Sequence, residues 1–135
     1  MKVVILGCSL VGSLLANQLM AKGDEVSVVD QNPGSFKRLD REFMGKTILG
    51  IGMDEEALKS AGIEKAEAFI AVTNEDNTNL MAAQLVREKF KTPKILLRVY
   101  DPKRAQAFKE LGLNIICPTI DSAEKIKSLL LENLE

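Results

Sequence analysis

The sequence predicts an α/β protein, a Rossmann-like, doubly wound sheet of six parallel strands in a single domain. Short apolar runs alternate with longer segments of helical period along the whole chain. Several of these runs, such as VVIL, FIAV and ILL, are apolar at consecutive positions, as is typical of parallel strands covered by helices on both faces. The chain has 135 residues without a repeat or a linker, so we expect one domain over residues 1–135.

The predicted elements follow one another as β-α units. We expect strands at 2–7, 25–30, 46–50, 66–72, 94–100 and 113–117, and helices at about 11–22, 33–43, 54–61, 75–90, 102–111 and 120–133. Gly23, Gly62 and Gly112 each follow the end of a predicted helix, where a left-handed residue commonly closes the last turn. Right-handed crossovers leave few topologies, and the Rossmann strand order 3-2-1-4-5-6 is the one we expect.

Composition excludes several classes of function. Eighteen basic and nineteen acidic side chains give a net charge of -1, so there is no overall positive field to attract nucleic acid. The chain has no histidine, the commonest general base and metal ligand, and neither Cys8 nor Cys117 belongs to a metal-ligand pair. We therefore expect no metal, and we expect Cys8 and Cys117 to be small buried or half-buried residues. No apolar stretch approaches the roughly 20 residues that cross a bilayer, and we expect a cytoplasmic protein.

The segment GCSLVG, residues 7–12, resembles the dinucleotide fingerprint G-x-G-x-x-G with a serine in the middle position. In that fingerprint the first glycine makes a tight turn, the second lets the backbone approach a pyrophosphate, and the third lets the helix pack on the sheet. Gly7 and Gly12 match the first and third glycines. Ser9 is small, so we expect a modified site, with the phosphate displaced outward or bonded to the hydroxyl. The alternative is that Gly7 and Gly12 are only turn and packing glycines.

Asp30 ends the second predicted strand, 23 residues after Gly7, where a carboxylate can accept hydrogen bonds from ribose hydroxyls. A carboxylate repels a 2'-phosphate, and the next residues, Gln31 and Asn32, offer no cation to receive one. NAD(H) or an adenine nucleotide is therefore expected in preference to NADP. The alternative is that Asp30 is a solvated strand end.

Further candidate residues follow the fourth and fifth strands, whose carboxyl ends face the same crevice. Thr73 and Asn74 come directly after the fourth strand and either contact a ligand or, in the case of Asn74, only cap the next helix. Arg98 lies in the apolar run ILLRV, where an unpaired charge is costly to bury. Its partner would be a phosphate in the crevice, an acid on a neighbouring subunit, or a local carboxylate.

Three segments carry a resemblance to a known family: VVILGCSLVGSLLANQL followed by VVD, then EALKSAGIEKAEAFIAVTNEDNTNL, then ILLRVYDPKRAQAFKELGLNIICPT. Over essentially its whole length the chain resembles the potassium-transport nucleotide-binding domain, the regulator of K+ conductance in bacterial Trk and Ktr uptake systems. The resemblance implies a cytoplasmic switch without catalytic chemistry. It binds NAD(H), ATP, ADP or AMP, assembles through homodimers into rings, and controls a separate membrane K+ transporter in trans, at the inner face of the membrane.

The same resemblance implies which residues form the site. The phosphate turn would run from Gly7 through Cys8, Ser9, Leu10 and Val11 to Gly12, with Asp30 at the ribose and Thr73, Asn74 and Arg98 completing the pocket. Members often carry Gly-Asp near the adenine, where this chain has Gly50 and Ile51. Many members also carry an arginine at the position of Leu10 to hold distal phosphates, and the leucine argues against ATP.

The family's usual carboxyl-terminal ligand-binding lobe is not expected after the last helix. Residues 119–135 place apolar side chains largely on one side of that helix, which either covers its own sheet or packs on a partner subunit. These side chains are Ile120, Ile126, Leu129, Leu130 and Leu134, and Leu131 extends the apolar side.

Two alternatives stand beside the regulatory function. One is a small nicotinamide-dependent oxidoreductase, which the absence of histidine and of a substrate domain disfavours. The other is a degenerate module that dimerises without nucleotide, suggested by Ser9 and Ile51.

Overall fold

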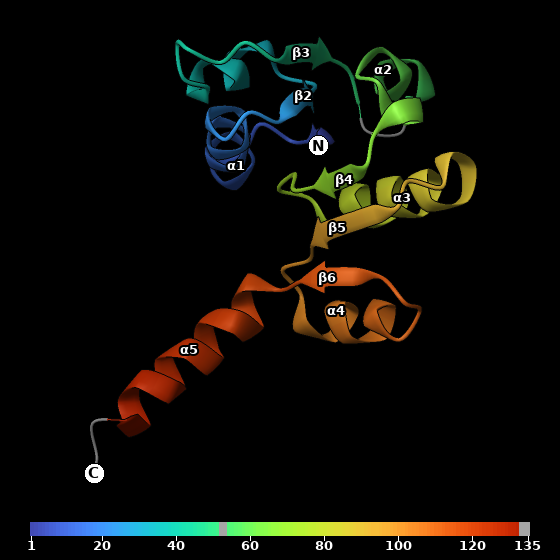
Figure 1. The fold of residues 1–135 in the computed structure, drawn as a ribbon. Helices are drawn as coiled ribbons and strands as arrows, with labels where there is room; N and C mark the ends of the chain where they lie inside the picture. The colour runs from blue at the N-terminus through green and yellow to red at the C-terminus, as the bar shows by residue number, and fades with distance from the viewer. Residues whose placement is uncertain (52–53, 133–135) are drawn as a thin grey trace.

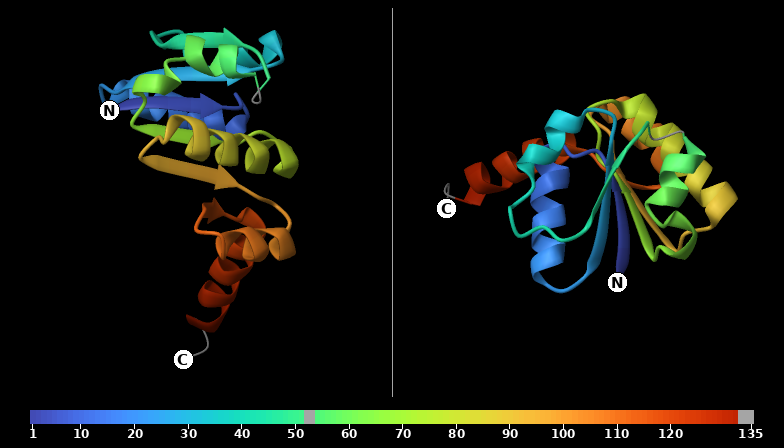
Figure 2. Two further views of the ribbon diagram at one scale, coloured as in Figure 1. Left: turned by 90° about the vertical axis from the view of Figure 1, so that its right-hand side faces the viewer. Right: turned by 90° about the horizontal axis from the view of Figure 1, so that it is seen from above.

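The computed structural model describes residues 1–51 and 54–132 and contains one six-stranded parallel sheet. The strand order is β3-β2-β1-β4-β5-β6, which confirms the predicted fold class and topology. Figures 1 and 2 show the sheet running through the middle of the body. The strands are β1 (Lys2–Leu6), β2 (Glu25–Asp30), β3 (Lys46–Leu49), β4 (Ala68–Ala71), β5 (Lys94–Arg98) and β6 (Asn114–Ile116).

Helices cover both faces of the sheet, as a parallel sheet requires. The view from above in Figure 2 shows α1 on one side of the strands and α2 and α3 on the other. The α-helices are α1 (Leu10–Ala21), α2 (Glu55–Ser60), α3 (Asp76–Leu85), α4 (Pro102–Lys109) and α5 (Pro118–Glu132). Shorter helical turns are η1 (Pro33–Arg38), η2 (Ile63–Lys65) and η3 (Val86–Phe90).

Each face of the sheet has its own hydrophobic core, because successive strand residues point to opposite faces. Val3 and Ile5 of β1 belong to the core beneath α1, whereas Val4 and Leu6 belong to the core beneath α2, α3 and α4. All four side chains are buried. This double burial is the physical reason for the unbroken apolar run at residues 3–6.

Two predicted helices differ from the structure. The segment 33–43 forms only the 3-10 turn η1, which begins at Pro33, is capped by the side chain of Asn32 and ends where Leu39 becomes extended. Gly34 and Ser35 favour helix weakly, so nothing extends this turn into an α-helix. The segment 75–90 begins as α3 and ends in the π-type turn η3, and Lys91 closes it with a φ of 53°.

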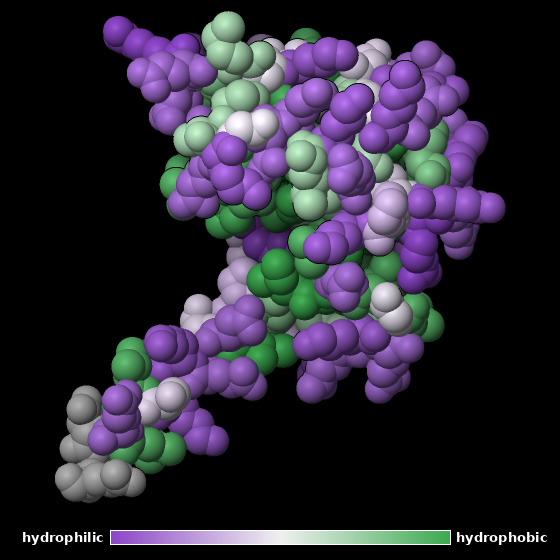
Figure 3. Space-filling model, in the orientation of Figure 1, coloured by the Kyte–Doolittle hydropathy of each residue, from purple (hydrophilic) through white to green (hydrophobic). Residues whose placement is uncertain are grey.

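Helix α5 projects away from the sheet, as Figures 1 and 2 show. No residue of α5 is buried, and Ile126 and Leu130 are 66% and 65% exposed. In its first turn the half-buried Ile120 packs against the core beneath α2, α3 and α4. The rest of the described helix does not cover its own sheet, which was one of the two predicted roles; Leu134 lies outside the described residues. Figure 3 shows hydrophobic residues in the notch between the body and α5. None of the helices formed by residues 1–51 and 54–132 combines the length and the hydropathy needed to cross a bilayer.

Candidate functional site

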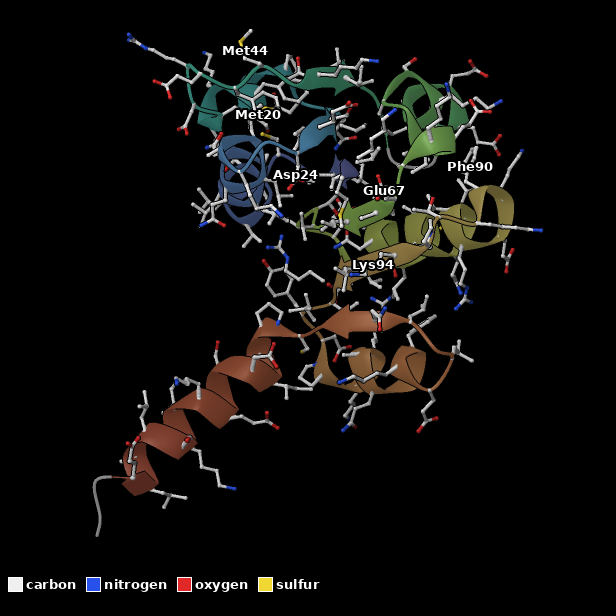
Figure 4. All side chains as sticks on the ribbon, in the orientation of Figure 1. Met20, Asp24, Met44, Glu67, Phe90 and Lys94 are labelled. Carbon is white, nitrogen blue, oxygen red and sulfur yellow. The ribbon has the colours of Figure 1, made fainter. Side chains whose placement is uncertain are left out.

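A cavity of about 430 Å³ opens at the carboxyl edge of the sheet, where the strand order reverses between β1 and β4. Asp24, Glu67 and Lys94, labelled in Figure 4, mark the opposite edge, where β2, β4 and β5 begin. Ligands of doubly wound sheets bind at this reversal point. The cavity is lined by Leu6, Gly7, Cys8, Ser9, Val29, Asp30, Gln31, Asn32, Ser35, Arg38, Gly50, Ile51, Thr73, Asn74, Glu75 and Thr78.

The turn between β1 and α1 depends on its two glycines. Gly7 has a φ of 105°, and a Cβ atom there would lie 2.8 Å from the backbone nitrogen of Thr73. A Cβ atom on Gly12 would lie 2.0 Å from the carbonyl oxygen of Gly7. The first glycine therefore makes the turn and the other allows α1 to pack against it, as the fingerprint predicts.

Ser9 caps the first turn of α1 from within the protein. Its hydroxyl accepts a hydrogen bond from the Gly12 amide at 3.1 Å and donates one to the carbonyl of Val72 at 2.8 Å. The hydroxyl is thus engaged by protein groups and does not take the expected position as a donor to a phosphate. Because the side chain turns toward β4 and is buried, it does not fill the cavity.

The start of α1 presents unpaired amide groups. Within residues 1–51 and 54–132, the amides of Ser9, Leu10 and Val11 have no acceptor, whereas the Gly12 amide is capped by Ser9. Such amides and the helix dipole together favour an anion. The Leu10 and Val11 side chains are exposed, and neither these residues nor Gly12 line the cavity.

Asp30 connects the end of β2 to the phosphate turn. One carboxylate oxygen accepts the Cys8 amide at 2.8 Å and the other accepts the Asn32 amide at 2.8 Å. Asp30 is half-buried in the cavity wall, so it is not the freely solvated strand end of the alternative interpretation. A carboxylate oxygen has two lone pairs, so each oxygen can still accept a ribose hydroxyl.

Arg38 is a cavity residue that sequence reasoning missed. Its guanidinium donates to the Cys8 carbonyl at 2.8 Å, and the Cys8 amide donates to Asp30. Both backbone polar groups of Cys8 are therefore fixed by side chains of the cavity. Burial, with a smaller contribution from the Asp30 carboxylate, raises the pKa of the Cys8 thiol, and the Arg38 charge opposes this. Cys8 and Cys117 are buried free thiols, as predicted. The sequence prediction considered only Gln31 and Asn32, which directly follow Asp30, whereas Arg38 lies eight residues after Asp30.

The end of β4 forms the opposite wall. The N-cap residue of α3 is Glu75, whose side chain makes no capping hydrogen bond. Asn74 therefore does not cap the helix, contrary to the alternative interpretation. Asn74 is exposed and lines the cavity. Thr73 is held by the fully buried Asn79, whose side-chain oxygen accepts the Thr73 amide at 3.0 Å and hydroxyl at 2.7 Å. Asn79 was missed because a polar residue in a helix gives no sign of its burial.

Arg98 lies behind this wall rather than in the cavity lining. The residue is 4% exposed, and its guanidinium donates to the carbonyls of Val72 at 2.9 Å and Thr73 at 3.0 Å. It also lies 3.3 Å from the Asn74 side-chain oxygen and stacks on the Tyr100 ring. Within the described part of the chain no carboxylate pairs with it, so the local ion pair among the three predicted partners is not formed.

Gly50 and Ile51 complete the cavity beside Asp30. The Gly50 amide donates to the Asp30 carbonyl at 3.0 Å, and a Cβ atom on Gly50 would lie 2.6 Å from that of Ala57. Ile51 is 56% exposed and adds an apolar surface to the lining. The cavity thus has unpaired amides near one wall, a carboxylate and an apolar side chain at another, and Arg38, which donates to Cys8, among its lining residues. Among the described residues, no group of three potential His, Cys, Asp or Glu ligands could hold a metal ion.

Comparison with protein families gives a match to the TrkA-N domain over residues 3–118. The chain is 42% identical over 131 residues to the Trk system potassium uptake protein TrkA of Streptomyces coelicolor, covering 97% of this chain and 59% of the relative. It is 35% identical over 131 residues to a TrkA homolog of Methanothermobacter thermautotrophicus, covering 96% and 60%. The chain therefore spans about three fifths of these relatives. They are named as potassium uptake proteins and not as enzymes.

Solved structures share the fold at lower identity. The TrkA-N domain of the inner membrane protein ybaL from Escherichia coli has a TM-score of 0.80 at 23% identity and covers 99% of this chain and 96% of that domain. The AMP-bound Kef CTD from Shewanella denitrificans has a TM-score of 0.79 at 23% identity, covering 97% and 81%. The GsuK channel bound to NAD has a TM-score of 0.71 at 22% identity, covering 85% and 21%.

Proposed function

Since the chain belongs to the TrkA-N domain family, we propose that it is the nucleotide-binding regulatory module of a potassium uptake system. It binds NAD(H) or an adenine nucleotide in the cavity beside β1 and acts on a separate membrane K+ transporter from the cytoplasmic side. The observation that carries this proposal is the set of unpaired amides of Ser9, Leu10 and Val11, which follow directly after Cys8, whose own amide donates to the Asp30 carboxylate. They offer donors for a diphosphate and acceptors for a ribose.

In the proposed binding mode, the phosphates and the ribose of the nucleotide contact different walls of the cavity. The phosphates lie against the start of α1, because unpaired amides and the helix dipole favour negative charge there. The ribose hydroxyls lie against Asp30, and the adenine lies toward Ile51. Solved structures of similar fold that carry AMP and NAD support this class of ligand. Regulation follows when the nucleotides differ in their affinity for two arrangements of the subunits.

Arg38 bears on whether the cavity prefers NAD(H) or NADP. The sequence predicts NADP to be disfavoured because Asp30 repels a 2'-phosphate, yet the guanidinium of Arg38 shares the cavity with this carboxylate. ATP is disfavoured because Leu10 cannot hold distal phosphates. The ligands to compare are therefore NAD+, NADH, NADP+, AMP, ADP and ATP.

The test is calorimetric titration with these ligands, combined with thermal unfolding. A ligand at 100 times its Kd stabilises a protein by about 2.7 kcal/mol, which is a readily measured shift in Tm. We expect at least one of NAD+, NADH, AMP and ADP to bind. If none of the six ligands binds or shifts the Tm, the nucleotide-binding function is excluded and the degenerate dimerisation module is favoured.

Asp30→Ala is expected to weaken nucleotide binding about tenfold or more, because hydrogen bonds to a charged group are among the stronger ones. The substitution also leaves the Cys8 and Asn32 amides without their acceptor, so the Tm of the free protein is expected to fall. Glu88→Ala, an equal change of charge at an exposed position of η3, is the matched control. Equal affinities of the two variants would remove Asp30 from the site.

A further inference from the structure

Arg98 is a buried cation, and its hydrogen bonds to the residues that the structure describes all go to neutral groups. It is 4% exposed, and within residues 1–51 and 54–132 its Nε atom has no hydrogen-bond partner. The nearby carboxylate of Asp76 accepts the backbone amides of Tyr100 and Asp101 instead. Neutral oxygens satisfy the geometry of a guanidinium but leave its charge uncompensated, and charge is costly to bury unpaired. Its field therefore favours negative charge nearby.

The contacts of Arg98 also change what the cavity wall can donate. Its Nη2 atom faces the carbonyl oxygens of Val72 and Thr73 and the side-chain oxygen of Asn74. The Val72 and Thr73 oxygens also accept hydrogen bonds from the Ser9 hydroxyl and the Asn79 amide, but these donors are neutral. Among the described residues, the guanidinium is therefore the group that brings positive charge to these oxygens. Because a guanidinium only donates, Asn74 must turn its oxygen toward Arg98, which leaves its side-chain NH2 group free to donate. The described residues provide no acceptor for that group, and Asn74 lines the cavity.

Arg98 is also linked to the phosphate turn through one carbonyl group. The Val72 oxygen accepts both the Arg98 guanidinium at 2.9 Å and the Ser9 hydroxyl at 2.8 Å, and the same hydroxyl caps Gly12. The serine that replaces the middle glycine of the fingerprint is thus held in place by a carbonyl that the buried cation polarises. Hydrogen bonds in such chains strengthen one another.

We infer that Arg98 is a positioning residue that makes this cavity selective for anionic nucleotides without touching the ligand. It orients Asn74 as a donor, neutralises the carbonyls of the β4 wall, and supplies a charge that a phosphate compensates. This inference rests on the proposed nucleotide-binding function. It differs from the role that the family resemblance implies, in which Arg98 is part of the pocket lining.

The experiment compares the affinities of ADP and adenosine, which differ in charge but share the base and ribose. Arg98→Gln removes the charge and is expected to lower the ratio of ADP affinity to adenosine affinity about tenfold or more, since a charge several ångströms away still acts strongly in a partly buried site. Arg98→Lys keeps the charge and is expected to keep the ratio within about threefold. Both variants lose the guanidinium hydrogen bonds to Val72, Thr73 and Asn74. A fall in Tm in both variants would therefore report the contribution of these bonds to stability, and the affinity ratio tests the inference.

Arg87→Gln is the matched control, because Arg87 also donates to a carbonyl, that of Leu111, but belongs to η3 and does not line the cavity. It is expected to leave the ratio unchanged. A wild-type ratio in Arg98→Gln, or an equal loss of the ratio in Arg98→Lys, would overturn the inference while leaving nucleotide binding intact. Failure of the wild-type protein to bind any of the six nucleotides would instead refute the proposed function, and a protein that binds AMP but not ADP is compared with AMP and adenosine in the same way.

A crystal structure of the wild-type protein with ADP tests the inference without any variant, should Arg98→Gln fail to fold. The Asn74 side-chain nitrogen is expected about 3 Å from a phosphate oxygen, with Arg98 still behind the wall. An Asn74 side chain that turns its oxygen to the ligand, or an Arg98 guanidinium that contacts the phosphate directly, would contradict the positioning role.

Discussion

At the scale of single residues, the phosphate turn shows how one substitution in a fingerprint is accommodated. Ser9 is small and polar enough to turn inward, where it caps α1 and donates to the carbonyl of Val72, directly after β4. The capping hydrogen bond satisfies an amide that would otherwise be unpaired at the helix start. A larger or apolar residue at position 9 could not do both.

Gly12→Ala is expected to destabilise the protein by at least about 3 kcal/mol, because the new methyl group would meet the Gly7 carbonyl and force the backbone of the turn to shift. Gly23→Ala is the control. Gly23 has a φ of 101° but no atom within 4 Å of the added Cβ, so only the conformational cost of about 1–2 kcal/mol applies. Urea unfolding of both variants measures the difference. Equal losses would show that close packing at Gly12 is unimportant.

At the scale of elements, the strands were predictable because parallel strands leave a strong signal. Residues 3–6 are buried on both faces, so their sequence is apolar without alternation, and the strand order then follows from handed crossovers. The carboxyl ends of the strands could therefore be placed together. This is why Gly7, Asp30, Thr73 and Asn74, taken from three separate segments, do line one cavity.

The remaining parts of the site lie in elements whose geometry the sequence does not determine. Arg38 reaches Cys8 because η1 is a short 3-10 turn, and helical periodicity does not distinguish such a turn from an α-helix. Asn79 is fully buried, although an asparagine in a predicted helix is expected at the surface. The position of Arg98 behind the wall depends on which oxygens surround it, and these oxygens come from the turn after β4.

At the scale of the whole molecule, α5 is the feature that the folded body leaves unexplained. It carries exposed apolar side chains and no buried ones, and its first turn is held to the body by the Thr119 hydroxyl, which donates to the Tyr100 carbonyl at 2.8 Å. A helix with an apolar side in water is typical of an interface. Packing on a second copy of the chain is the predicted role that the structure leaves open.

We predict that Ile126→Asp combined with Leu130→Asp lowers the oligomeric state, because these residues lie one turn apart on α5 and would bring charge into an apolar interface. Light scattering coupled to size-exclusion chromatography measures the mass. Lys125→Asp with Lys127→Asp, in the same helix, is the control for changed charge. A monomeric wild-type protein, or a double variant of unchanged mass, would remove α5 from the interface.

We expect a nucleotide to place its phosphates against the start of α1 although Ser9 replaces a glycine of the fingerprint. A crystal structure of the protein with NAD+ tests it most directly. We expect oxygens of the diphosphate within about 3 Å of the Leu10 and Val11 backbone nitrogens, and a ribose hydroxyl on Asp30. A cofactor bound away from these amides, or a cavity that stays empty when NAD+ is saturating in solution, would contradict it.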